Sequence, residues 1–156
     1  MWIAPFLAIA LIAEARIAAS PGPAAPPALR AAVEYEIDPG HSRVGFKVRH
    51  LGISSVHGHF NRFAGRFAFD PADPAASWTE VTIEAASIDT ENERRDSHLR
   101  SADFLEAERH PDITFTSRRV EPAGGAAGEG RWRIEGDLAI RGVTLPVVLD
   151  ATLGGQ

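Results

Sequence analysis

The sequence predicts an all-β domain in which an antiparallel sheet curls into a barrel or a sandwich. Beyond residue 33, apolar and polar residues alternate with a period of two, which is the pattern of half-buried strands. The alternating runs are separated by short segments rich in glycine, proline and aspartate, which favour turns. One stretch, near 91–107, departs from the alternation and predicts a short helical excursion.

The predicted strands each have one apolar face, because successive residues of a strand point to opposite sides. Their apolar positions, in chain order, are Val44, Phe46 and Val48; Val56, Gly58 and Phe60; Phe63, Gly65, Phe67 and Phe69; Val81 and Ile83 within residues 78–88; Ile113 and Phe115; Trp132, Ile134, Leu138 and Ile140; and Leu145, Val147, Leu149, Ala151 and Leu153. We expect the phenylalanine-rich face to form the interior of the fold.

Turn residues punctuate these strands. Residues 70–74 contain two prolines, which cannot donate to a strand ladder, and predict a loop. The glycine-rich residues 124–128 predict a flexible hairpin connection, and Gly142 marks a tight turn between the last two strands. In the helical excursion, Asp89 or Thr90 is the expected N-cap, and Pro111 prevents the helix from continuing into the next strand.

The first 32 residues are predicted to lie outside the domain. Residues 2–13 are apolar throughout, and as a helix they would span about 18 Å, short of the ~30 Å hydrocarbon core of a membrane. That length and the small residues that follow predict a signal peptide over residues 1–19; an uncleaved anchor and a buried helix are the alternatives. Residues 20–32 are rich in proline and alanine and predict an extended linker, which leaves an exported domain at 33–156.

Composition excludes several functional classes. The net charge of −5 and the pI of about 5.6 argue against a nucleic-acid partner, which requires a basic face. The absence of cysteine excludes disulfides, thiol catalysis and thiolate metal sites. Lys47 is the one lysine among 16 basic residues. No nucleophile elbow, P-loop, dinucleotide-binding or zinc-protease motif is present, so we expect no catalytic residue and no cofactor.

Two histidines alternate with the interior residues of their strand. His57 and His59 point the same way, so that both imidazoles could reach one metal ion, with His41 or His50 completing the set. They alternate with Val56 and Phe60, however, which places them on the outer, polar face. The favoured interpretation is therefore a pair of solvated histidines, with a metal site as the alternative.

Polar residues near the ends of the apolar face leave two interpretations open. His50 lies in phase with Val44 and Val48, where its imidazole could bind a ligand head group or a neighbouring backbone carbonyl. The cluster of Arg94, Arg95, Asp96, His98 and Arg100 could be a solvated helix face or a rim that neutralises an anionic head group. The role of the phenylalanine-rich face is also open, because its side chains could fill a packed core or line a lumen for one apolar ligand.

An ordered set of motifs resembles the YceI-like family. The motifs are YEID (35–38), VGFKVRHLG (44–52), GHF (58–60), FAG (63–65), SIDT (87–90), RDSHLRSADF (95–104), HPDITF (110–115) and GDLAIRGVT (136–144). The resemblance implies an antiparallel, lipocalin-like β-barrel, exported to the periplasm. It also implies that the lumen binds a polyisoprenoid or similar long-chain amphiphile, such as an isoprenoid quinone, a prenyl phosphate or a lipid amide.

The resemblance also implies which residues contact the ligand. Carried over by position, the residues expected to contact the chain of the lipid are Val44, Phe46, Val48, Phe60, Phe67, Ile83 and Phe115, and those expected at its head group, or supporting it, are His50, Asp96 and His98. The segment that contains Asp96 and His98 could instead pin the helix onto the barrel. Members of the family resemble carriers, stores or stress-related sensors of lipids, with a membrane or electron-transport protein as partner.

The resemblance further implies strands beyond those counted in this sequence. About six long strands are predicted, whereas a closed lipocalin-like barrel uses about eight. We therefore expect a barrel that is either open, truncated, or completed by a partner or a second copy in a homodimer. Two rival functions remain at this point: an enzyme that acts on an isoprenoid lipid through His50 or His98, and an interaction module whose barrel is packed without a ligand.

Overall fold

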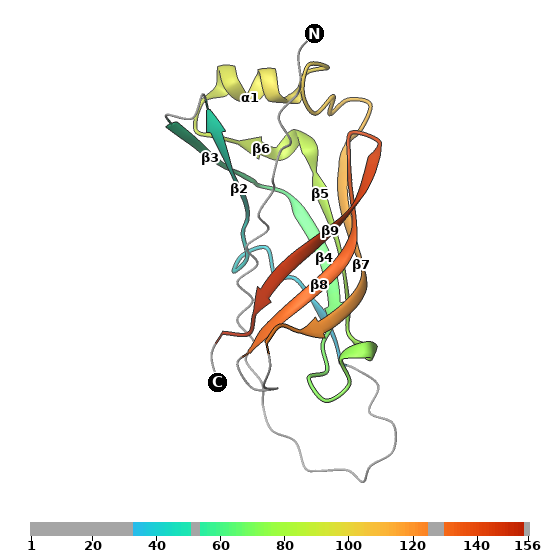
Figure 1. Cartoon of the computed structure of the whole chain (residues 1–156). Coiled ribbons are helices and arrows are strands. Elements are labelled where there is room, and N and C mark those ends of the chain that lie inside the picture. The colour runs from blue at the N-terminus through green and yellow to red at the C-terminus, as the bar shows by residue number, and fades with distance from the viewer. Residues whose placement is uncertain (1–32, 51–53, 125–129, 155–156) are drawn as a thin grey trace.

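The alternating sequence forms two antiparallel sheets, which a computed structural model describes for residues 33–50, 54–124 and 130–154 (Figure 1). The strands are β1 (Glu34–Glu36), β2 (Val44–His50), β3 (Ser54–Phe60), β4 (Phe63–Ala68), β5 (Trp78–Glu84), β6 (Ile88–Asp89), β7 (Asp112–Pro122), β8 (Arg131–Ile140) and β9 (Val143–Thr152). One sheet has the order β1-β4-β5-β7-β8-β9 and the other the order β2-β3-β6. The predicted all-β, antiparallel class is confirmed, and over the described residues the two sheets do not close into a complete barrel.

Two pairs of consecutive strands connect the two sheets. Asn61 and Arg62 lie between β3 and β4, which pair with β6 and β5 respectively. The prediction of one continuous strand over residues 78–88 is wrong, because a 3₁₀ turn at Ala85–Ser87 separates β5 from β6. Ser87 holds this corner: its hydroxyl donates to the Glu84 carbonyl at 2.7 Å and accepts from the Arg62 N–H at 3.0 Å.

The helical excursion is shorter than expected. Helix α1 spans Glu93–Arg100, and residues 101–110 form turns. Its N-cap is Asn92, whose side chain accepts the Arg95 N–H at 3.0 Å, so the assignment of Asp89 or Thr90 to that role is wrong. The physical reason is that both side chains are already engaged: Asp89 accepts the Glu91 N–H and Thr90 bonds Asp96.

The predicted turns and loop around the later strands fit the observed backbone. Arg141 and Gly142 both have positive φ, 50° and 72°, which is the two-residue type I′ turn that antiparallel twist favours. Residues 70–74 form the expected loop, which leads into a 3₁₀ turn at Pro74–Ala76. The β7–β8 pair is antiparallel, as the expected hairpin requires, but residues 125–129 of the connection lie outside the described residues.

The outer face of the six-stranded sheet is polar and carries cross-strand ion pairs. Arg66 lies directly opposite Glu80, with a 3.0 Å hydrogen bond from Nε to Oε1. Arg62 pairs with Glu84, and the Arg62 guanidinium lowers the pKa of that carboxyl. Exposed pairs of this kind contribute little stability, but they show that this face of the sheet is in contact with solvent.

A carboxylate ties the β8–β9 turn to the segment after α1. Glu106 accepts a hydrogen bond from Arg109 at 2.8 Å and one from Arg141 at 3.4 Å, while Arg141 also donates to the Ala102 carbonyl at 2.7 Å. The hydrogen bond from Arg109, with the help of Arg141, holds the pKa of the Glu106 carboxyl below its ordinary value. These contacts fix the β8–β9 turn beside the end of the fold that α1 covers (Figure 1).

The Glu106 contacts predict a specific acid sensitivity. A carboxyl whose pKa is lower in the folded state stabilises the fold above its unfolded pKa of about 4.3, and this contribution is lost as the pH falls through the folded pKa. The difference in melting temperature between wild type and Glu106→Gln is therefore expected to be largest near neutral pH and to shrink between about pH 5 and pH 3. Thermal scans across this range would measure it, with exposed Glu108→Gln as the control; a difference independent of pH would contradict the assignment.

Candidate functional site

A row of residues crosses the inner face of the six-stranded sheet, and the row ends in an exposed residue on the edge strand β9. Backbone register places Gly65, Val81, Phe115, Leu138 and Leu145 side by side on β4, β5, β7, β8 and β9. Val81 is 6% exposed and Phe115 2%, but Leu145 on the edge strand is 51% exposed. The same apolar face therefore begins as a packed core and ends as an exposed apolar edge at Leu145.

This inner face is concave. The rings of Phe69, just after β4, and Trp132, on β8, meet edge-to-face with centroids 4.9 Å apart. Two strands, β5 and β7, lie between β4 and β8, so a flat sheet would separate them by roughly 14 Å. Part of the curvature has a local cause, because β7 has a register shift between Ser117 and Arg119, and such a bulge bends a strand.

One end of the inner face is closed by α1 and the turns after it. Leu105 and Ala107, from those turns, are buried in the same apolar cluster as residues of both sheets, and Leu99 of α1 packs against it. Figure 1 shows α1 lying across the end of the sheets where β2 ends and β3 begins. The buried members of this inner cluster are Val44, Phe60, Val81, Ile83, Ala85, Ile88, Leu105, Ala107 and Ile113.

The residues expected to contact a lipid chain all lie on the inner faces of the two sheets. Val44, Phe60, Ile83 and Phe115 are buried; Phe46, Val48 and Phe67 are half-buried. In the three-stranded sheet, the ring centroids of Phe46 and Phe60 are 5.6 Å apart; in the six-stranded sheet, Phe67 stacks on Tyr35 at 5.2 Å. Val44, Phe60 and Ile83 thus share one buried cluster, against which Phe46 packs, and ligand contact by the predicted residues remains a prediction.

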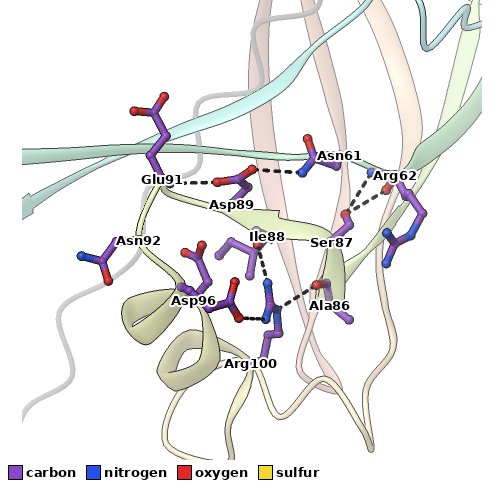
Figure 2. Close-up of a pocket in the computed structure, with 11 residues that line it drawn as sticks. Asn61, Arg62, Ala86, Ser87, Ile88, Asp89, Glu91, Asn92, Asp96 and Arg100 are labelled. Carbon is purple, nitrogen blue, oxygen red and sulfur yellow. Dashed lines mark hydrogen bonds and ion pairs between the residues drawn. The ribbon is translucent and has the colours of Figure 1, made fainter.

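Asp96 is engaged in internal hydrogen bonds. Asp96 is 3% exposed, and its Oδ1 accepts both the Thr90 N–H at 3.0 Å and the Thr90 hydroxyl at 2.5 Å. Arg95 donates to the same Thr90 hydroxyl at 2.7 Å, and Arg100 donates to the Ala86 and Ile88 carbonyls at 2.9 and 3.2 Å. Figure 2 shows Arg100 reaching from α1 to the corner before β6. These contacts pin the helix to the sheet.

The two histidines predicted at a head group lie on β2 and on α1. His98 is exposed, lies 3.2 Å from the Asp103 carboxylate and meets the Phe104 ring edge-to-face. His50 ends β2, but its side chain lies outside the described part of the structure. The roles of both residues toward a ligand stay predictions.

His57 and His59 lie on the outer side of β3, out of phase with buried Phe60. His59 bonds Arg43 at 3.0 Å and lies 4.0 Å from the Asp89 carboxylate, while His57 is exposed. Within the described ranges, no group of three or more histidine, aspartate or glutamate side chains is arranged to hold a metal ion. In the same ranges, no helix has the length and apolar character needed to cross a membrane.

A polar depression of about 420 Å³ lies between α1 and the bend of β3–β4 (Figure 2). Its polar groups bond one another: Asn61 donates to Asp89 at 3.2 Å, and Glu93 accepts from Arg100 at 3.2 Å. The Glu91 N–H, then Asn61, lower the pKa of Asp89. Sequence reasoning missed this depression, since it depends on the corner at residues 85–87, and its internally satisfied groups indicate a structural role.

Trp132 is a second feature that the sequence alone did not reveal. Its indole Nε1 has no access to solvent and no hydrogen-bond partner, and among the described residues it is the sole buried side-chain nitrogen or oxygen in that state. Register places Trp132 between Pro122 and Ala151, on the inner face and at the opposite end of β8 from α1. Alternation could predict that the ring faces inward, but not that its N–H would lack an acceptor.

Comparison of the chain with known protein families agrees with this geometry of two bent sheets around a concave apolar face. Residues 35–156 match the profile of the YceI-like domain. The chain belongs to the YceI-like family. The resemblance of the sequence motifs to this family is thereby confirmed, and it covers all the described strands except the first residue of β1.

Relatives and solved structures support the same assignment. A UPF0312 protein of Pectobacterium atrosepticum is 44% identical over 129 residues, and the YceI protein of Escherichia coli O157:H7 is 46% identical over 127. These matches cover 83% and 80% of this chain, which spans only 65% and 64% of the length of the two relatives.

Among crystal structures, BcnA of Burkholderia cenocepacia matches with a TM-score of 0.70 at 28% identity, covering 77% of this chain and 72% of BcnA. The YceI protein of Campylobacter jejuni matches with a TM-score of 0.60 at 41% identity, covering 78% and 68%. The YceI-like chain therefore has the lipocalin-like architecture that its motifs imply.

Proposed function

We propose that this YceI-like chain is a non-catalytic binding protein for a polyisoprenoid or similar long-chain amphiphile. The apolar tail lies along the concave inner face, and the protein acts as a carrier, store or sensor of the lipid. The observation that carries this proposal is the row from Val81 to Leu145, which stays apolar while its exposure rises from 6% to 51%.

The inner face offers an apolar tail a continuous surface. Beyond Leu145, the inward-pointing residues of β9 include Val143, which is 59% exposed, and half-buried Val147 and Leu149. Covering such a surface with hydrocarbon is favourable by about 0.8 kcal/mol for each CH₂ group that leaves water. A long chain could therefore obtain substantial affinity from this face without any charged contact.

The polar groups support a non-catalytic role. Asp96 forms a hydrogen bond with Thr90, and His59 forms one with Arg43. His98 lies beside the Asp103 carboxylate. None of these contacts joins a nucleophile to a base that would activate it. An enzyme acting on an isoprenoid lipid remains testable, because turnover lost in His98→Ala would overturn this part of the proposal.

The proposal includes export to the periplasm through a signal peptide at residues 1–19. The support is the apolar run 2–13 with small residues after it. Fractionation of cells that express the full chain, followed by N-terminal sequencing, tests this directly. A periplasmic protein that begins near residue 20 is expected, and an intact residue 1 on the isolated protein would contradict cleavage.

Lipid binding is tested by extracting the purified protein with organic solvent and identifying the extract by mass spectrometry. An isoprenoid lipid in roughly stoichiometric amount is the expected result. An extract free of lipid after gentle purification, combined with no binding of added farnesol, would contradict the proposed function and would favour a packed interaction module.

Strand β9 provides a matched pair of variants that separates its two faces. Leu145 points to the inner face and is 51% exposed; Val148 points to the outer face and is 56% exposed. Leu145→Ser is expected to weaken farnesol binding about three- to tenfold, because it removes apolar contact area, whereas Val148→Ser leaves it unchanged. Displacement of a fluorescent naphthylamine dye measures both affinities, and equal effects of the two variants would place the ligand elsewhere.

A further inference from the structure

The indole N–H of Trp132 is a buried donor that the described protein groups leave unbonded. Buried N–H groups in folded proteins almost always have a partner, because removing such a group from water without replacing its hydrogen bond is unfavourable. An orphaned donor on the face that binds a ligand therefore indicates where a ligand acceptor would be bound.

Among the described residues, the side chains beside Trp132 provide no strong acceptor. The cross-strand neighbours on its face are Pro122 and Ala151, which have no polar side-chain atoms. The Phe69 ring meets the indole at 4.9 Å and nearly at right angles, but an aromatic face accepts an N–H only weakly. An oxygen atom that entered this apolar environment would form the stronger bond.

The two ends of the concave face differ in a way that bears on ligand orientation. At the α1 end, Leu105 and Ala107 close the interior with apolar groups, and the nearby Asp96 and Arg100 already bond Thr90 and backbone carbonyls. At the opposite end, the Trp132 indole has an unused donor beside the Phe69 ring. Among the residues that the structure describes, this is the one buried side-chain donor that is left for a hydrogen-bonding head group.

We propose that Trp132 Nε1 donates a hydrogen bond to an acceptor oxygen on the head group of the bound amphiphile. The tail then runs along the inner face toward α1, so the head lies at the end opposite to the helix. This inference rests on the proposed function and adds to it a binding residue, a ligand orientation and a requirement for an oxygen acceptor in the head group.

The test compares two probes with the same carbon skeleton, farnesol and farnesene; farnesene lacks the hydroxyl group and has one more double bond. Their affinities for wild type, Trp132→Phe and Trp78→Phe are measured by displacement of the naphthylamine dye. Phenylalanine keeps an aromatic ring against Phe69 but removes the donor. Trp78 is a matched control, because it lies on the outer face beside Arg66, with the guanidinium 5.8 Å from its ring centroid.

The expected result is that Trp132→Phe weakens farnesol binding about five- to tenfold while changing farnesene binding less than about twofold. Trp78→Phe should change neither. Far-UV circular dichroism and the melting temperature of the free proteins show whether each variant is folded. If Trp132→Phe misfolds, farnesol and farnesene affinities of the wild type decide: preference for farnesol supports the proposal, and equal affinity overturns it.

Other outcomes separate this inference from the proposed function. Equal weakening of both probes in folded Trp132→Phe would overturn the hydrogen bond and leave lipid binding intact, since only ring contact would then be lost. No binding of either probe to wild type would overturn the proposed function, and the inference with it.

Discussion

Replacing Asp96 by alanine is expected to lower the free energy of unfolding by about 2–4 kcal/mol. The change removes the acceptor of two hydrogen bonds and leaves the Thr90 N–H and hydroxyl partly unsatisfied in a site where Thr90 is 5% exposed. Because Arg95 of α1 also bonds the Thr90 hydroxyl, the substitution should weaken the contacts that hold α1 to the sheet as well. Urea denaturation followed by circular dichroism measures the effect.

Two further variants give this prediction its controls. Asp96→Asn retains the side-chain carbonyl oxygen and should lose much less stability than the alanine variant. Glu93→Ala removes an exposed partner of Arg100 on the same helix and should cost less than about 0.5 kcal/mol. If Asp96→Ala matched Glu93→Ala, the hydrogen bonds of Asp96 would not be what holds α1 to the sheet.

Gly136→Ala is expected to destabilise the fold by about 2–3 kcal/mol. A Cβ atom at this position of β8 would lie 2.6 Å from two carbons of the Phe115 ring and 2.5 Å from the Thr116 carbonyl oxygen. Phe115 is 2% exposed and cannot move aside without repacking the interior. The glycine therefore allows the ring to lie against the neighbouring strand, and its replacement forces both the ring and the backbone to shift.

The matched control is Gly45→Ala, near the start of β2. There a Cβ atom would lie 3.5 Å from the nearest atom, the Gly58 carbonyl oxygen, which is ordinary van der Waals contact. This variant should change stability by less than about 0.5 kcal/mol, or raise it, because alanine restricts the unfolded chain more than glycine does. Chemical denaturation of both variants decides the point, and similar losses would show that strand glycines matter here through backbone effects rather than through the Phe115 ring.

The faces of the strands could be predicted from the sequence because the constraint is local. Side chains two residues apart on a strand point the same way. The apolar faces that contain Val81, Phe115 and Leu138 can therefore be predicted before any strand pairing is known. The β8–β9 turn was predictable for the same reason, since Gly142 favours the positive φ that a two-residue hairpin requires. The motif set then identified the family, because order and spacing carry more information than any single motif.

The corner at residues 85–87 and the true helix cap could not be predicted in this way. The corner depends on partners distant in the sequence: Ala85 donates to the Pro111 carbonyl at 2.7 Å, and Ser87 bonds Arg62. Asp89 and Thr90 resemble helix caps by type, but Asp89 bonds Asn61 and Glu91, Thr90 bonds Asp96, and Asn92 takes the role. The orphaned N–H of Trp132 is also a tertiary property, because it depends on what surrounds the indole.

The central claim, that the concave inner face holds the lipid tail, is most directly tested by photo-crosslinking. The full chain is incubated with a farnesyl probe that carries a benzophenone, irradiated, digested and mapped by mass spectrometry, with excess unlabelled farnesol as competitor. We expect labels that farnesol displaces on inner-face residues such as Leu138, Leu145 and Val147. Labels confined to outer-face residues such as Thr82 and Val148, or labels that farnesol does not displace, would contradict the claim.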